Sequence, residues 1–201
     1  MDTVNGGHAV RTVPVYEVLA ADIKSLGVEA VFGLMSDDTA LFVTALDMAG
    51  ITFHGARHEN AAISMAEGYA YASGSLGIAV VGRGPATANG LHAAVYAART
   101  GSRVLIIYGD AAFGTSSTNA LGPDYKAFNA LGVLTAAGLQ VLRATSAAGA
   151  RTTLADAAGL AMQGNAVALL LPTSIQLSKL EWDDADPAPS VVVAETRAES
   201  A

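Results

Sequence analysis

A carboxylate followed by a long run of small apolar residues is the feature of this sequence best suited to chemistry. Glu59 comes just after a probable strand and opens a window of small residues that ends at Gly74. A helix N-terminus favours an ionised carboxylate, whereas apolar neighbours such as Ala62 and Ile63 disfavour the charge by desolvation. A solvated glutamate in the first helical turn is the simplest interpretation, but few polar residues follow Asn60. The pattern therefore makes Glu59 a candidate functional residue.

Four glycine-bearing loops are candidates for the rest of a site, because ligands bind at the carboxyl ends of parallel strands. They span residues 33–38, 55–59, 82–90 and 109–114. The third loop follows a strand and opens a helix, as a dinucleotide fingerprint does. Thr87 stands where the third glycine belongs, however, and no acidic residue follows about 20 positions later. A tight turn is the better interpretation, and a dinucleotide-binding domain is a minor alternative.

Several other kinds of site are excluded by composition and spacing. His54, His58 and His92 fall at a strand end, at a helix start and within a helix, so we expect no metal site on this chain. No nucleophile elbow is present, and the absence of cysteine excludes a disulfide framework and thiolate catalysis. The net charge of −7 makes a nucleic-acid partner a poor match.

The cellular context follows from the distribution of apolar residues. The hydrophobic fraction is 52% and the charged fraction 14%, so much of the chain should be buried in its own core or against partners. The N-terminus lacks a basic region followed by an apolar run, and no run of about 18 apolar residues occurs. We therefore expect no signal peptide, no membrane span and a cytoplasmic protein.

Apolar runs that alternate with alanine-rich helical windows indicate the fold. Strands are predicted over 29–33, 51–55, 76–81, 103–108, 139–144 and 166–171. Helices are predicted over 13–26, 37–48, 59–73, 124–131 and 148–163, and a further helix is predicted to follow the glycine-rich turn and end at about Arg99. Thr12 is expected to cap the first of these helices, and Ser36 or Asp37 the second. Strands that are apolar on both faces predict an α/β three-layer sandwich, with a roughly six-stranded parallel sheet flanked by helices on both faces.

Changes in composition along the chain define the expected domain boundaries. Residues 1–11 are an N-terminal extension, residues 12–177 form the domain, and residues 178–201 read as an extended or mobile tail. The tail is expected because Asp and Pro gather after position 182 and charged residues return at the end.

Six short segments follow one another in an order that resembles a known family. They are VFG at 31–33, RHENAA at 57–62, AEGYA at 66–70, GIAVV at 77–81, GPATANG at 84–90 and RVLIIYG at 103–109. This order resembles the N-terminal pyrimidine-binding (PYR) domain of thiamine-diphosphate-dependent enzymes of the acetolactate synthase and 2-oxo-acid decarboxylase type. The similarity covers most of residues 12–175.

The resemblance implies a role for each candidate residue. In the family, the glutamate that matches Glu59 presents its carboxyl group to the pyrimidine ring nitrogen of thiamine diphosphate. That contact favours the imino tautomer, which removes the thiazolium proton, and the resulting ylid attacks a substrate carbonyl. Besides Glu59, the implied cofactor-binding residues are Gly33, Leu34, Met35, Pro85 and Asn89. The implied substrate pocket consists of Ser36, His58, Phe128 and Asn129. The helix that follows Glu59 is implied to pack across a dimer interface.

The sequence departs from the family pattern in ways that bear on the reaction. Gly33-Leu-Met-Ser36 replaces the usual Gly-x-Pro-Gly, and the turn at 84–89 reads GPATAN in place of the commoner GPGATN. Residues 110–123 contain no histidine, where decarboxylases with a histidine pair carry it. This favours carboligation over a pyruvate-decarboxylase-like reaction. Phe128-Asn129 stands where acetolactate synthases have Phe-Gln.

The length predicts that another chain completes the enzyme. The diphosphate-binding domain of the family carries Gly-Asp-Gly and a later Asn, whereas the only Gly-Asp here, Gly109-Asp110, is followed by alanine. We expect thiamine diphosphate and Mg²⁺ to be held with a separate diphosphate-binding (PP-domain) subunit, in a hetero-oligomer with paired PYR domains. The substrate is expected to be a small 2-oxo acid or an aldehyde. The initial Met and the solvated tail favour a natural subunit over an excised fragment. The alternative is a non-catalytic assembly or regulatory module with the same fold.

Overall fold

The computed structural model describes residues 10–111, 126–183 and 185–192. Its centre is a six-stranded sheet in the order β3-β2-β4-β5-β7-β6, with parallel pairing throughout. The strands are β2 (Ala30–Gly33), β3 (Thr52–Gly55), β4 (Gly77–Val81), β5 (Val104–Asp110), β6 (Gln140–Arg143) and β7 (Val167–Pro172). From β2 the chain moves outward to β3, and from β4 it moves the other way to β5. Open α/β sheets bind ligands where such connections diverge, so the β2–β4 boundary is the expected place for a site.

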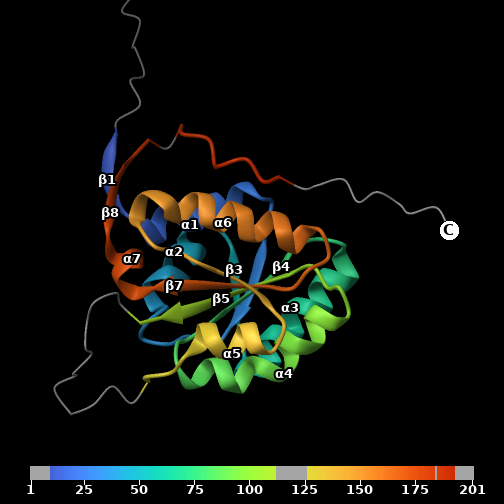
Figure 1. The fold of residues 1–201 in the computed structure, drawn as a ribbon. Helices are drawn as coiled ribbons and strands as arrows, with labels where there is room; N and C mark the ends of the chain where they lie inside the picture. The colour runs from blue at the N-terminus through green and yellow to red at the C-terminus, as the bar shows by residue number, and fades with distance from the viewer. Residues whose placement is uncertain (1–9, 112–125, 184, 193–201) are drawn as a thin grey trace, which may run out of the picture.

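Helices cover both faces of this sheet (Figure 1). One face packs against α1 (Val15–Ser25), α2 (Ala40–Met48), α6 (Ala147–Met162) and α7 (Thr173–Leu177). The other packs against α3 (Glu59–Ser73), α4 (Pro85–Arg99) and α5 (Ala130–Ala136). Side chains alternate between the two layers along each strand: in β5, Leu105 and Ile107 enter the first core, and Ile106 and Tyr108 the second. The predicted three-layer α/β sandwich is confirmed. No helix in the described part of the chain is long and apolar enough to cross a membrane.

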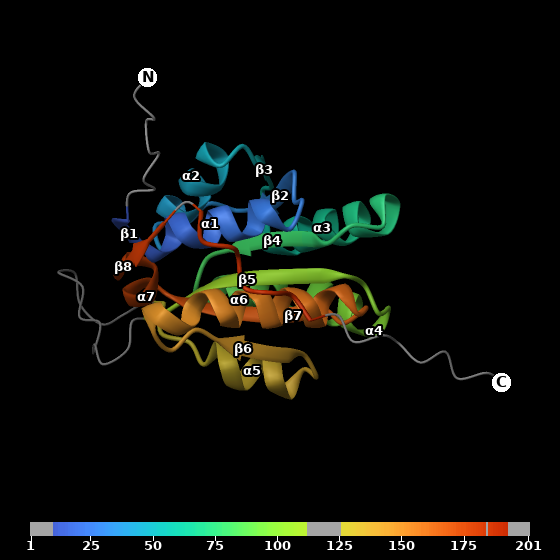
Figure 2. The ribbon, with the colours of Figure 1, turned by 90° about the horizontal axis from the view of Figure 1, so that it is seen from above.

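A second, two-stranded sheet joins the ends of the domain, and the sequence analysis did not predict it. Strand β1 (Arg11–Pro14) pairs antiparallel with β8 (Lys179–Trp182), and Figure 2 shows both beside α1. The Arg11 guanidinium lies 5.8 Å from the Trp182 ring centroid, a cation–π geometry. Farther along, the Val192 carbonyl accepts a 3.4 Å hydrogen bond from Gln163, so the described part of the expected tail runs against α6.

The structure corrects several predicted helix starts. Helix α1 begins at Val15, because Thr12 lies in β1, and Pro14 occupies its N-cap without a side-chain cap bond. Helix α2 begins at Ala40, with Thr39 at the N-cap. Helix α5 begins at Ala130, since the Asn129 side chain caps it through the Gly132 N–H at 2.9 Å. Part of the helix predicted over 124–131 lies outside the described residues.

Glycines bring α3 close to its neighbours and so fix the position of Glu59. A Cβ atom at Gly77 would lie 2.1 Å from the Ala66 carbonyl oxygen, so α3 and β4 approach more closely than any larger residue permits. A Cβ atom at Gly90 would lie 2.6 Å from Ile63 Cδ1 and 3.5 Å from Glu59 Cβ. Helices α3 and α4 therefore pack in direct contact at the end of the sheet where α3 begins.

Candidate functional site

A cleft of about 280 Å³ opens at the carboxyl end of the sheet, where the loops after β2 and β4 diverge. The start of α3 also contributes to its wall. The lining residues come from four separate segments: Leu34, Met35, Ser36, Glu59, Gly82, Arg83, Pro85, Ala86, Asn89 and Lys126. The cleft therefore lies where the topology predicts a ligand site.

Glu59 is a buried carboxylate at the first position of α3. Its residue surface is 7% exposed, and its Oε2 accepts a 3.1 Å hydrogen bond from the side chain of Asn89 on α4. Oε1 has no hydrogen-bond partner among the residues that the structure describes. Glu59 therefore lines the cleft with one oxygen fixed and the other available to a ligand.

Two neighbours of Glu59 hold the start of α3 in place. The His58 ring occupies the N-cap, and its Nδ1 accepts a 3.2 Å hydrogen bond from the Asn60 N–H. The Asn60 side-chain oxygen accepts a 2.9 Å bond from the Ala93 N–H, which ties α3 to α4. His58 thus acts as a helix cap here and does not line the cleft.

The structure brings together most of the residues predicted to bind the cofactor. Leu34, Met35, Glu59, Pro85 and Asn89 all line the cleft, together with Ser36 from the predicted substrate pocket. Gly33 lies just before it, where a Cβ atom would meet the Val80 carbonyl oxygen at 2.3 Å. Phe128 is 39% exposed and Asn129 caps α5. Neither lines the cleft, so the substrate roles assigned to them and to His58 stay predictions.

Sequence reasoning missed an ionic cluster beside the cleft. Asp38 is buried, with its side chain 4% exposed, and its Oδ2 accepts a 2.7 Å hydrogen bond from the Arg83 N–H. Its Oδ1 accepts from Lys126 Nζ at 2.6 Å and from Ser36 Oγ at 3.1 Å. Lys126 Nζ also donates to Asp37 and, at 3.3 Å, to Ser36 Oγ. One buried carboxylate therefore joins the loops after β2 and β4 to the segment before α5.

Asp37 and Lys126 keep each other ionised. The hydrogen bond from Lys126 is the largest cause that holds the pKa of the Asp37 carboxyl far below its usual range. Burial lowers the pKa of Lys126, but hydrogen bonds to Asp37 and Asp38 and their charges outweigh it and raise that pKa. Asp37 and Lys126 are therefore both charged throughout the physiological pH range.

The glycines of the third loop make room for protein atoms. A Cβ atom at Gly82 would lie 2.8 Å from the Ser36 side chain. Gly84 has φ of 68°, and a Cβ atom there would lie 2.3 Å from the Lys126 carbonyl oxygen. These contacts agree with the interpretation of this loop as a tight turn packed against the protein.

The fourth predicted loop carries a separate ion pair. Asp110 at the end of β5 lies 2.6 Å from the guanidinium of Arg143 at the end of β6. Neither residue lines the cleft, and the rest of this loop, from residue 112, lies outside the described residues. Within the described ranges, no group of three or more His, Asp or Glu residues is arranged to hold a metal ion.

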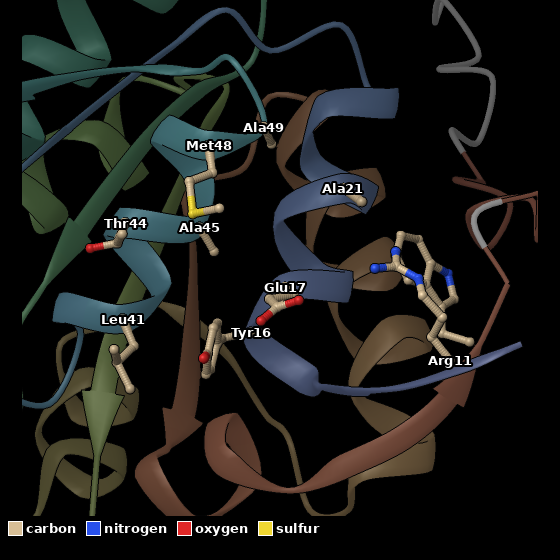
Figure 3. A pocket seen from close by; sticks show the side chains of 10 residues that line it. Arg11, Tyr16, Glu17, Ala21, Leu41, Thr44, Ala45, Met48 and Ala49 are labelled. Atoms are coloured by element: carbon tan, nitrogen blue, oxygen red, sulfur yellow. The ribbon is translucent and has the colours of Figure 1, made fainter.

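A second cleft of about 280 Å³ lies between α1 and α2 (Figure 3). These helices cover the face of the sheet opposite to the one covered by α3 and α4. Its lining is mostly aliphatic and aromatic, with Arg11 and Glu17 as its charged members. The buried polar and charged residues of the described chain lie elsewhere. The cleft beside Glu59 is therefore the better candidate for catalysis, because it combines a buried carboxylate with several polar groups.

The sequence matches a protein family described as "Thiamine pyrophosphate enzyme, N-terminal TPP binding domain" over residues 14–130. The chain belongs to this family. The matched region includes every residue that lines the cleft beside Glu59. The resemblance seen in the sequence is confirmed at this level, and thiamine diphosphate is the cofactor that the family binds. No curated protein matches the chain.

The residues of the thiamine pyrophosphate enzyme domain fit a heteroaromatic ring in the cleft. Leu34, Met35, Pro85 and Ala86 give it apolar walls. Glu59 adds a carboxyl oxygen that takes no hydrogen bond from the described residues, and a ring nitrogen or its proton is a suitable partner for such an oxygen. Asn89 fixes the orientation of that carboxyl group through its hydrogen bond to Oε2.

Proposed function

We propose that this chain is the pyrimidine-binding subunit of a split thiamine-diphosphate-dependent enzyme that acts on a 2-oxo acid or an aldehyde. The observation that carries the proposal is the buried Glu59 carboxyl, which lines the cleft with Oε2 fixed and Oε1 available. The diphosphate and Mg²⁺ are assigned to a separate PP-domain subunit, since the sequence lacks Gly-Asp-Gly. An acetolactate synthase-like carboligase is favoured over a 2-oxo-acid decarboxylase, because no histidine occurs in residues 110–123.

The residues of this chain have distinct tasks in the proposed reaction. When bound, thiamine diphosphate supplies the nucleophilic carbon and the electron sink. Leu34, Met35 and Pro85 exclude water from the pyrimidine side of the cleft. Glu59 Oε1 holds the proton at the pyrimidine ring nitrogen, and Asn89 keeps the carboxyl group oriented toward it. Burial of Glu59 strengthens that interaction, because the local dielectric constant is low. The rate of exchange of the cofactor's C2 proton tests this role.

The isolated chain is expected to bind thiamine diphosphate weakly or not at all. Charge-assisted contacts to the diphosphate and its metal normally supply much of the affinity, and the chain lacks the Gly-Asp-Gly motif. Isothermal titration calorimetry with cofactor and Mg²⁺ measures this directly, with free thiamine as the control that lacks the diphosphate. Tight binding of the diphosphate form by the chain alone would refute the split site.

The outer face of α3 is expected to be buried against another chain. It presents Ala61, Ser64, Met65, Gly68 and Tyr71, and the Tyr71 surface is 88% exposed. Gly68→Glu should weaken association and leave the fold intact, since a Cβ atom at Gly68 has no other atom within 4 Å. An unpaired charge buried in an interface costs a few kcal/mol, so we expect association to weaken by about 100-fold.

Light scattering of the chain, alone and mixed with its PP-domain partner, measures this association. Met48→Glu on α2 is the matched control, because it places the same charge on an 82%-exposed methionine of the opposite layer. A wild-type chain that stays monomeric under all these conditions would contradict the prediction. Equal loss of association in the two variants would place the interface elsewhere.

A further inference from the structure

Lys126 presents a cation to the cleft that the proposed function has not yet used. Its side chain is 14% exposed, and it lines the cleft together with Glu59. Its ammonium group donates to two carboxylates, Asp37 and Asp38, and to Ser36 Oγ. A largely buried lysine with a fixed position in a ligand cleft is suited to bind an anionic group of the ligand.

The two carboxylates that bind Lys126, those of Asp38 and Asp37, differ in burial and in the number of hydrogen bonds that they accept. Asp38 has a 4% exposed side chain and takes further hydrogen bonds from the Arg83 N–H and Ser36 Oγ, so it is a permanent counter-ion. The Asp37 side chain is 76% exposed, and its other hydrogen bond comes from Ser36 Oγ at 3.0 Å. Exposed ion pairs contribute little stability, so Asp37 can turn into water at small cost.

We propose that Lys126 binds the carboxylate of a 2-oxo acid substrate, and that Asp37 occupies this position until the substrate displaces it. The identity of the substrate as a 2-oxo acid rests on the proposed function. One carboxylate replaces another on the same ammonium, so the exchange leaves no buried charge unpaired. With Asp37 turned away, the Lys126 ammonium keeps its 2.6 Å contact with Asp38 and offers the incoming anion the donor that Asp37 had occupied.

The arrangement separates two classes of substrate. A 2-oxo acid carries the carboxylate that Lys126 recognises, whereas an aldehyde lacks it and gains nothing from this group. The loop 34–38, where the sequence departs from the family pattern, supplies Ser36 and both aspartates. Lys126 is therefore a specificity-determining residue, and a 2-oxo acid is the substrate that the cleft favours.

Nuclear magnetic resonance of the full chain, with lysine labelled by ¹³C and ¹⁵N, tests this assignment without turnover or a partner. The probe is oxamate, an unreactive analogue of pyruvate, and methyl oxamate is the matched neutral ligand. We expect oxamate to shift the Lys126 side-chain resonances and methyl oxamate to leave them in place. Loss of a charge-assisted hydrogen bond predicts about tenfold weaker oxamate binding in Lys126→Met, monitored in samples with labelled leucine and methionine through the Leu34 and Met35 signals.

Three further variants separate recognition from a structural effect. Lys126→Arg should restore oxamate binding, and Asp37→Asn should tighten it, because the competing carboxylate is gone. Lys24→Met should change nothing, since Lys24 binds the Gly50 carbonyl away from the cleft. Oxamate binding that is absent, that is equal in Lys126→Met, or that weakens in Asp37→Asn would overturn the proposal. Oxamate binding does not require Glu59 to activate the cofactor. A failure of this proposal can therefore be distinguished from a failure of the proposed function, which is tested by exchange of the cofactor's C2 proton.

Discussion

Glu59→Gln is expected to slow exchange of the cofactor's C2 proton, and turnover with it, by about two to four orders of magnitude in the complex with the PP-domain subunit. Gln is nearly the same size as Glu, so the packing of α3 against α4 should survive. Its amide can still form hydrogen bonds to Asn89 and to the cofactor, but it cannot hold a transferable proton at the pyrimidine nitrogen. Exchange measured by proton–deuterium replacement should fall in parallel with the turnover number.

The matched control is Glu67→Gln, about two helical turns along α3. Glu67 is half-buried, accepts a 2.9 Å hydrogen bond from Ser102 Oγ and does not line the cleft. This variant should retain nearly full exchange and turnover. If Glu59→Gln kept full activity, or if Glu67→Gln were the more damaging change, Glu59 would not be the residue that activates the cofactor.

The sequence predicted the main sheet because its strands carry a strong local signal. Segments such as 104–108 and 167–171 are apolar at every position, which is typical of strands covered on both faces. The windows rich in glycine and alanine that form α3 and α4 also predicted helices from the sequence. Strands β1 and β8 were missed because their antiparallel pairing joins residues at opposite ends of the domain, which no local pattern reveals.

The candidate site was only partly predictable, for a physical reason. Glu59 stands out locally, because a carboxylate before an apolar helix conflicts with its surroundings. Lys126 and Asp38 look like ordinary surface residues, and their contact spans 88 positions along the chain. The helix-cap prediction for Asp37 failed for the same reason, since its carboxylate pairs with Lys126. Local sequence patterns do not reveal such long-range pairs.

Asp38→Ala is expected to lower the free energy of unfolding by about 3 kcal/mol, the second large effect, because it removes the acceptor for three donors at once. The Arg83 N–H, Ser36 Oγ and the Lys126 ammonium would lose a shared partner in a site where the Asp38 side chain is 4% exposed. For a domain of this size, thermal unfolding should shift down by roughly 6 to 12 °C. The cleft should widen as well, since Asp38 joins three of the segments that form it.

The neighbouring Asp37→Ala is the matched control and should change the unfolding temperature by no more than about 2 °C, because exposed ion pairs contribute little. Asp38→Asn keeps an acceptor for the Arg83 N–H but gives up the negative charge beside Lys126, so its loss of stability should fall between the two. Differential scanning calorimetry of the three variants gives this order directly. Equal stability of Asp38→Ala and Asp37→Ala would mean that Asp38 does not hold the edge of the cleft together. A larger loss in Asp37→Ala would reverse the roles of permanent and exchangeable counter-ion on Lys126.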